Sequence, residues 1–280
     1  MQQPVSQSQP QERPVVALMT DFGLGDGDVG VMKGVIAGIA PHAQIIDFTH
    51  EIAPQNVASA AWILSTAYRY FPAGTIFVCV IDPGVGSSRG AIAVAAGNQF
   101  FVGPDNGLFS YIYAEQPVHG AVLLQNPAYQ LPQVSSTFHG RDIFAPAGAY
   151  LARGVALSEF GASIDPATLE RISIAPPERK RSSIEASIRH IDHFGNMITS
   201  IPLSLVPDLF DLGEVRAEFA GNHPVVTQRR RFFAGGARDG VPFIYGDSSG
   251  YVGIAVRDGS AARALGVSAS TPVTLVFKEQ

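Results

Sequence analysis

The sequence has one cysteine, few charged residues and no long apolar run. The single cysteine, Cys79, excludes a disulfide within the chain, and such usage is typical of the reducing cytoplasm. No apolar stretch reaches the roughly 20 residues that a membrane-spanning helix needs. Charged residues make up 15% of the chain and the net charge is -5, which argues against a nucleic-acid-binding surface. We therefore expect a cytoplasmic protein with a small-molecule ligand and neither a membrane nor a nucleic-acid partner.

What is present is enough apolar material for a sizeable core. The 280 residues are 46% hydrophobic, which predicts a compact protein of two domains. Residues 1–13 are rich in Gln, Ser and Pro, and we expect a disordered tail there and not a signal peptide. Residues 171–183 are rich in Pro and charge, as linkers are. The predicted domains are therefore residues 14–170 and 184–280.

The two predicted domains differ in class. In the first, strand-like runs at 15–20, 44–48 and 75–81 alternate with helix-like runs at 31–40 and 56–71, and a hairpin follows at 91–96 and 99–102. This alternation predicts an α/β domain with a mainly parallel sheet, whose functional loops lie at the carboxyl ends of its strands. Six short β-type runs after residue 184 predict a smaller, all-β, barrel-like domain; they are residues 184–191, 197–201, 215–219, 242–245, 251–256 and 273–277.

Asp21 directly follows the first predicted strand and begins a Gly-dense loop. The glycine spacing matches neither the dinucleotide fingerprint nor the P-loop, and the ligand pattern of a calcium loop is missing. A carboxylate here suits a neutral polyol, because its two oxygens can accept hydrogen bonds from both hydroxyls of a ribose. The alternative is that Asp21 only caps the next helix.

Two further segments bring reactive side chains to Gly-containing turns. Asp82 ends a predicted strand within an Asp-Pro-Gly turn, and Arg89, seven residues later, can fold back onto it. His139 precedes a helix-like run at 143–153, where Asp142 could serve as the N-terminal cap. A carboxylate, a guanidinium and an imidazole at such positions indicate chemistry more than folding.

The second domain has two polar turns. A hairpin at 192–196 explains a Gly195-Asn196 pair without any function, but it leaves Asp192 and Phe194 unexplained. In the turn at 245–250, the hydroxyls of Ser248 and Ser249 are available to a carboxylate. The segment 104–107 is typical of a structural turn that leads into a helix.

Together these segments resemble the S-adenosylmethionine hydroxide adenosyltransferase family, which is related to the fluorinating and chlorinating enzymes. The matching stretches are residues 20–23, 81–86 with Arg89, 102–108, 137–146, 191–201 and 248–256, in order along nearly the whole folded region. One departure is Arg257, where hydrolytic relatives usually carry Asn, and this affects the expected adenine contacts of residues 257–261. The resemblance implies a homotrimer with active sites between the first domain of one subunit and the second domain of its neighbour.

The resemblance also implies roles for single residues. Asp82, Arg89 and His139 correspond to the trio that holds an attacking water, which the halogenating branch lacks. Asp21 corresponds to the carboxylate that binds the ribose diol. The residues that correspond to contacts with the methionine part and the adenine are Asp192, Phe194, Asn196, Ser248 and Ser249, with Phe233 at a stacking position.

The expected reaction converts S-adenosylmethionine and water into adenosine and methionine. Water or hydroxide attacks the ribose 5′ carbon in line with the departing sulfur, and His139 takes or shares the proton. No metal or cofactor is expected, because the sulfonium already carries the positive charge. Three alternatives stay open: a metal-dependent nucleoside or phosphoester hydrolase, a 5′-halogenase, and an adenosyl-ligand sensor without turnover. The metal-dependent alternative would use Asp21, Asp26 and Asp28 with His50 or His139.

Overall fold

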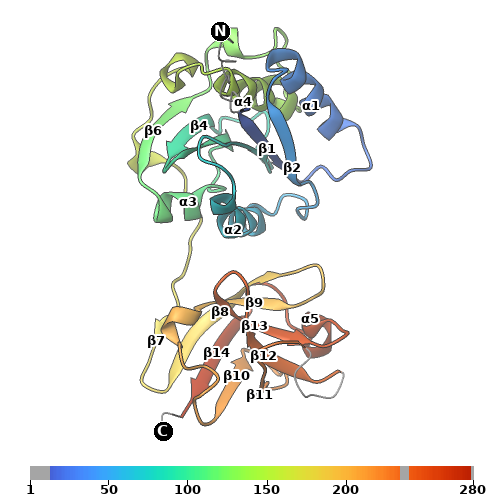
Figure 1. The fold of residues 1–280 in the computed structure, drawn as a ribbon, viewed down its shortest axis with the longest axis vertical. Helices are drawn as coiled ribbons and strands as arrows, with labels where there is room; N and C mark the ends of the chain where they lie inside the picture. The colour runs from blue at the N-terminus through green and yellow to red at the C-terminus, as the bar shows by residue number, and fades with distance from the viewer. Residues whose placement is uncertain (1–12, 234–239, 279–280) are drawn as a thin grey trace, which may run out of the picture. The chain divides into compact units, whose positions relative to one another are not determined.

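The computed structural model describes residues 13–233 and 240–278. Contacts within the chain divide it into two compact units, residues 1–172 and 173–280 (Figure 1). The tail expected at residues 1–13 lies outside the described residues except for its last position. Among the helices of the described ranges, none combines the length and the apolar character needed to cross a membrane.

The first unit alternates strands and helices. In chain order it contains β1 (Val15–Thr20), α1 (Asp28–Ile39), β2 (Gln44–Thr49), α2 (Val57–Ala67), β3 (Ile76–Val80), β4 (Ala91–Ala96), β5 (Gln99–Pro104), α3 (Ser110–Glu115), β6 (Val118–Leu123) and α4 (Ala145–Ala152). A π-helix, η3 (Gly140–Phe144), leads directly into α4, and short 3₁₀ turns are η1 (Tyr68–Tyr70), η2 (Pro127–Tyr129), η4 (Leu157–Phe160) and η5 (Pro166–Thr168).

The strands of the first unit form one sheet in the order β2-β1-β3-β5-β4-β6. The first four are mutually parallel, and β4 is antiparallel to both of its neighbours. This confirms the predicted α/β class with a mainly parallel sheet. The two central strands β1 and β3 are buried along their whole length, which is why their sequences are unbroken apolar runs.

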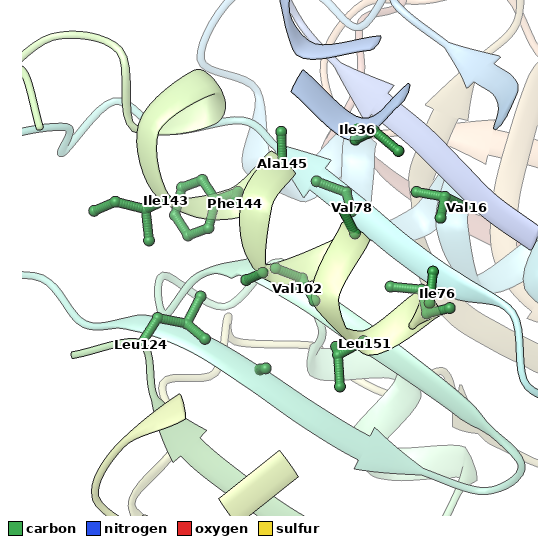
Figure 2. Close-up of a cluster of buried hydrophobic side chains, with 14 of the residues drawn as sticks. Val16, Ile36, Ile76, Val78, Val102, Leu124, Ile143, Phe144, Ala145 and Leu151 are labelled. Carbon is green, nitrogen blue, oxygen red and sulfur yellow. The ribbon is translucent and has the colours of Figure 1, made fainter. Parts of the chain in front are cut away.

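Helices cover both faces of this sheet (Figure 1). On one face α1 and α4 pack on alternate residues of the central strands, including Val16, Ile76 and Val78 (Figure 2). On the other face α2 and α3 pack on the intervening residues, such as Ala17 and Phe77. Successive side chains of a strand point to opposite faces, so one apolar run supplies both cores.

This topology brings the ends of neighbouring strands together. Since β1 and β3 are parallel and adjacent, the residues that follow them, Asp21 and Asp82, leave the sheet at the same edge. The hairpin predicted at 91–102 is present, with Gly97 at a positive φ of 54° in its turn. The helix expected after the turn at 104–107 is α3, the prediction missed β6, and α1 begins at Asp28, three residues before the predicted start.

The second unit is rich in strands. It contains β7 (Glu178–Arg179), β8 (Ser183–Ile191), β9 (Met197–Pro202), η6 (Leu203–Leu205), β10 (Val215–Phe219), β11 (Gln228–Arg229), β12 (Pro242–Gly246), β13 (Tyr251–Val256), α5 (Ala261–Leu265) and β14 (Pro272–Phe277). All six predicted runs are strands, and the prediction missed the two-residue strands β7 and β11 and the helix α5.

The strands of the second unit follow the order β10-β14-β8-β9-β13-β12-β11. Their pairings are antiparallel except the one between β11 and β12. The two ends of this order, β10 and β11, contact each other, so the sheet is nearly closed. This confirms the predicted barrel-like class. Its core contains residues from several of these strands, among them Ile184, Ile254 and Leu275.

Candidate active site

Asp82, Arg89 and His139 form one hydrogen-bonded chain in the first unit. The Nε of Arg89 donates to both oxygens of the Asp82 carboxylate, at 2.9 and 3.1 Å, and its Nη2 also donates to Oδ2 of Asp82. The same Nη2 lies 2.8 Å from Nδ1 of His139. The side chains of Asp82 and Arg89 are only 4% and 11% exposed, so water screens this pair poorly. The sequence prediction that Arg89 folds back onto Asp82 is confirmed.

Close backbone contacts join the loop that contains Asp82 and Arg89 to the segment that contains His139. Gly86 has a φ of +76°, and a Cβ atom on it would lie 2.3 Å from the Ser136 carbonyl oxygen. Only glycine allows the loop after β3 to approach the segment before His139 this closely. At the strand end, the Nδ2 of Asn106 donates to the Ile81 carbonyl at 2.9 Å. The predicted structural turn at 104–107 thus also holds the residue that precedes Asp82.

Asp142 holds the segment that carries His139. It lies inside the π-helix η3 and is fully buried. Its carboxylate accepts hydrogen bonds from the Ser135 backbone N–H at 2.8 Å and from Nε of Arg141 at 2.6 Å. Asp142 therefore does not cap the helix start, and that alternative is wrong. It connects the loop before His139 to the helix after it.

The pKa of His139 lies below the ordinary histidine value. Burial is the main cause of the lowered pKa, and the neighbouring Arg89 guanidinium adds to it. The carboxylates of Asp82 and Asp142 and a hydrogen bond with the Ser135 backbone oppose the shift. Arginine can only donate, so Nδ1 of His139 accepts from Arg89. In the neutral ring the proton then sits on Nε2.

Asp21 lies in the same pocket as Asp82 and His139. This pocket has a volume of about 240 Å³, and its other lining residues include Phe22, Gln55 and Phe138. The Oδ2 of Asp21 accepts the Gln55 backbone N–H at 2.7 Å. Because α1 begins after Gly27 with no side-chain cap, the alternative that Asp21 caps this helix is wrong.

The second unit contains a larger pocket, of about 900 Å³. Five of the six residues that the sequence assigned to this half of the ligand line it; they are Asp192, Phe194, Asn196, Phe233 and Ser248. Phe194 is 73% exposed, so its ring is available to a ligand. Phe233 packs edge-to-face on Tyr245, with ring centroids 5.1 Å apart.

Carboxylates hold the two loops of this larger pocket. Oδ1 of Asp192 accepts the backbone N–H groups of Phe194 and Asn196, and its Oδ2 accepts the Asn196 side-chain amide at 2.8 Å. The hairpin therefore does explain Asp192, contrary to the sequence interpretation. Oδ1 of Asp247 accepts the Ser249 backbone N–H at 2.8 Å and the Ser249 hydroxyl. Ser249 thus lies beside the pocket, bonded to a residue that lines it.

Sequence reasoning missed several lining residues. In the smaller pocket these include Gln55, which has a positive φ of 63°, and no local pattern marks it. In the larger pocket they include Tyr245, Asp247, Arg231 and Arg263, whereas Asp258 belongs to the expected contact segment 257–261. Asp247 falls in the polar turn that the sequence did single out, so its carboxylate was the available signal. The Nε of Arg257 lies 3.5 Å from the Asp258 carboxylate.

Among the described residues, the side chains named for the metal-dependent alternative do not form a donor set. Within residues 13–233 and 240–278, no three His, Cys, Asp or Glu side chains come together as a metal site would require. Asp21, Asp26, Asp28, His50 and His139 all belong to these ranges.

Two family descriptions match the chain, one for each unit. The N-terminal domain of SAM hydroxide adenosyltransferases matches residues 16–161, and the C-terminal domain of the same family matches residues 186–274. Together the two matches span well over half of the chain.

Individual relatives agree with these matches. A protein of Salinispora tropica named (R)-S-adenosyl-L-methionine hydrolase is 39% identical over 91% of this chain and 95% of its own length. A protein of Thermus thermophilus with the same name is 38% identical over 94% and 100%. A fluorinase of an Actinoplanes species is 26% identical over 94% and 97%. A crystal structure of an uncharacterized conserved protein from Thermotoga maritima is 34% identical, covers 93% of this chain and 99% of its own, and has a TM-score of 0.86.

Proposed function

The chain belongs to the SAM hydroxide adenosyltransferase family, and on this basis we propose that it hydrolyses S-adenosyl-L-methionine to adenosine and methionine. The names of the relatives at 38–39% identity support a hydrolase of this substrate. The observation that carries the proposal is the bonded chain of Asp82, Arg89 and His139 beside a pocket that also contains Asp21.

The difficult part of this reaction is the nucleophile. Methionine leaves as a neutral thioether, so the leaving group needs no general acid. Water or hydroxide must be held on the line from the 5′ carbon to the sulfur, and the trio of Asp82, Arg89 and His139 does this. Placing both reactants in this way can supply about 7–11 kcal/mol of the lowering of the barrier. The attacking oxygen and the sulfonium approach neutrality together, which favours the step in a pocket from which water is excluded.

The sequence left open whether His139 takes or shares the proton. Since Nδ1 accepts from Arg89, the neutral ring has its proton on Nε2 and acts there as a donor. We therefore assign His139 the role of a donor that, with the Arg89 cation, stabilises the negative charge on the water oxygen as its proton leaves. The Asp82 carboxylate orients Arg89 and is the proton acceptor among the three.

Asp21 and the second unit serve to bind the substrate. The Asp21 carboxylate accepts hydrogen bonds from the ribose diol, each worth about 1.5–3 kcal/mol. The Phe194 and Phe233 rings provide apolar faces for the adenine, and the polar turns that contain Asn196 and Ser248 bind its edge and the methionine part. These residues line the larger pocket.

Three further features belong to the proposal. The reaction needs no cofactor or metal, so treatment with a chelator leaves the rate unchanged. The enzyme acts in the cytoplasm, in keeping with its single cysteine. It forms a homotrimer in which the smaller pocket of one protomer faces the larger pocket of the next. Mixing a variant inactive in the smaller pocket with one inactive in the larger pocket would then restore part of the activity, whereas sites within one protomer would give none.

The direct test is product identification from the separate R and S forms of the substrate. The relatives' names specify the R form, and we expect this protein to convert that form preferentially into adenosine and methionine. Parallel incubations with chloride and fluoride test the 5′-halogenase alternative. A 5′-halo nucleoside as the main product would contradict the hydrolase proposal. Binding of the substrate without any product would indicate a sensor.

A further inference from the structure

Behind Asp21, four side chains form a second hydrogen-bonded chain, which we call the His50 chain: Lys33, Asp47, His50 and Thr20. Lys33 of α1 donates from Nζ to Oδ2 of Asp47 at 2.7 Å. Oδ1 of Asp47 lies 3.1 Å from Nε2 of His50, and Nδ1 of His50 lies 2.9 Å from the Thr20 hydroxyl. The His50 chain thus connects a helix, the end of β2 and the last residue of β1. The proposed reaction uses none of its members.

The inner half of the His50 chain is buried. Thr20 is 0% and His50 is 3% exposed, so water does not replace their mutual hydrogen bond. At the outer end the pKa of Asp47 lies below its ordinary value: burial raises it, but the hydrogen bonds from Lys33 and His50 outweigh burial. The chain therefore runs from a charged pair near the surface to a hydroxyl next to the pocket.

His50 holds the turn of Asp21 from both sides. Its ring bonds the hydroxyl of Thr20, the residue before Asp21, and its backbone carbonyl accepts the N–H of Gly23, two residues after Asp21, at 2.8 Å. The Thr20 hydroxyl also lies 3.3 Å from the Phe22 backbone N–H, which donates to it. The backbone on each side of Asp21 is thus fixed to one buried histidine.

A shift in strand register makes this arrangement possible. Leu18 pairs with Asp47, but the next residue, Met19, pairs with Thr49, so β2 has one extra residue at this point. Such a bulge re-aims the residues after it. Here it places Asp47 and His50 on the same hydrogen-bonded path toward the end of β1.

We propose that Thr20 and His50 are positioning residues that set the orientation of the Asp21 carboxylate toward a ribose diol. The inference rests on the proposed function, because it takes the diol as the partner of Asp21. A carboxylate in the wrong orientation reaches one hydroxyl and misses the other. The expected consequence is a loss of preference for ribose over 2′-deoxyribose, which a role in folding alone would not produce.

The first experiment compares the affinities of adenosine and 2′-deoxyadenosine by calorimetry, with melting temperatures measured alongside. Thr20→Val keeps the shape of the side chain and removes the hydroxyl. We expect it to lower the preference for adenosine about tenfold, because that corresponds to the loss of one hydrogen bond to a charged group. Thr20→Ser keeps the hydroxyl and the preference. Thr75→Val is the matched control, because Thr75 is equally buried and donates its hydroxyl to the Pro72 carbonyl, far from Asp21 in the sequence.

A second pair of variants keeps the test decisive if Thr20→Val does not fold. His50→Gln places its amide near the former Nε2, so it keeps the hydrogen bond to Asp47 and loses the one to Thr20. His50→Asn places its amide near the former Nδ1 and keeps Thr20. We expect the preference for adenosine to fall about tenfold in the Gln variant and to persist in the Asn variant.

The outcomes separate this inference from the proposed function. A folded Thr20→Val or His50→Gln protein with the wild-type preference overturns the inference and leaves the hydrolase proposal intact. If the wild-type protein hydrolyses the substrate but does not prefer adenosine over 2′-deoxyadenosine, the diol is not the partner of Asp21. The inference then fails as well. If the wild type prefers adenosine but forms no product, the proposed function fails, and a lowered preference in Thr20→Val still supports the inference.

Discussion

The two pockets of this molecule are built in opposite ways. The smaller one, in the first unit, has a volume of about 240 Å³ and is lined by Asp82 and His139, both already bonded to Arg89. The larger one, in the second unit, has a volume of about 900 Å³ and exposed aromatic rings such as Phe194. Its carboxylates Asp192 and Asp247 are bonded to their own loops.

This difference separates chemistry from recognition. In the smaller pocket, polar groups fixed before the ligand arrives need no reorganisation during the reaction, which is the main source of electrostatic catalysis. Under the proposed function, apolar rings of the larger pocket bind the ground state and the transition state equally well, so they lower KM and leave kcat unchanged. Variants of Asp82, Arg89 and His139 should therefore change kcat, and variants of the second pocket should change KM.

The largest effect is expected from Arg89→Lys. Lysine keeps the positive charge but loses the planar fork that bonds Asp82 twice and reaches His139. We expect kcat to fall about 10³-fold, as for the loss of one donor to a developing oxyanion. Steady-state kinetics measures this, with Arg69→Lys as the control, since Arg69 forms an exposed ion pair with Glu115. Wild-type kcat in Arg89→Lys would contradict the role of the trio.

His139→Asn should have the next largest effect and also change the pH profile. The Asn oxygen can replace Nδ1 as the acceptor for Arg89, but the Nε2 donor is lost, and we expect kcat to fall about 10²-fold. Protonation of His139 in the wild type removes the acceptor of Arg89, and its pKa is lowered by burial and by Arg89. The kcat/KM should therefore fall in acid with a midpoint below the ordinary histidine value of about 6.5.

The pH profile of His139→Asn should lack this acid limb, because Asn does not titrate. Persistence of the same limb in the variant would assign it to another group. The stability of the fold should also fall in acid. A histidine with a lowered pKa in the folded state stabilises the fold above its unfolded pKa, and this contribution is lost as the pH falls. The melting temperature of the wild type should thus drop more in mild acid than that of the variant.

Asp21→Asn should have a smaller effect, part of it on kcat and part of it on KM. An amide has one acceptor oxygen where the carboxylate has two, so one hydrogen bond to the diol is lost. We expect kcat/KM to fall about 30-fold, equivalent to about 2 kcal/mol. Asp26→Asn, on the same loop, should retain wild-type kinetics. An equally large loss in Asp26→Asn would instead favour the metal-dependent alternative, in which both residues are ligands.

Phe194→Ala should have the smallest effect and should act on KM alone. Stacking of a base on an aromatic ring is worth about 1–3 kcal/mol, so we expect KM to rise about tenfold with kcat unchanged. Tyr70→Ala removes an aromatic ring of similar exposure in the first unit and should change neither constant. A fall in kcat with constant KM in Phe194→Ala would contradict the division between the two pockets.

Sequence reasoning found the parts of this molecule that local patterns encode. The strands β1, β10 and β13 begin and end at the predicted residues, because their apolar runs are bounded by polar turns. The π-helix before α4 was missed, since the apolar periodicity of residues 143–153 does not distinguish a π-helix from an α-helix. The helix-cap hypotheses for Asp142 and Asp21 failed because each carboxylate accepts a backbone N–H of another segment, that of Ser135 and that of Gln55.

For the site, short motifs identified the residues but not their connections. Asp82 and Arg89 are seven residues apart, so their pairing was predictable, whereas Nδ1 of His139 as the acceptor required coordinates. The His50 chain joins residues 20, 33, 47 and 50 through a strand bulge and the approach of a helix. Spacing along the sequence gives no signal for such a path.

The most direct test of the central claim is the reaction in oxygen-18 water, followed by mass spectrometry of both products. If the trio of the smaller pocket holds an attacking water, the label appears in the 5′-hydroxyl of adenosine and methionine is unlabelled. Unlabelled adenosine, or label found in methionine or in a released ribose, would contradict in-line attack of water on the 5′ carbon.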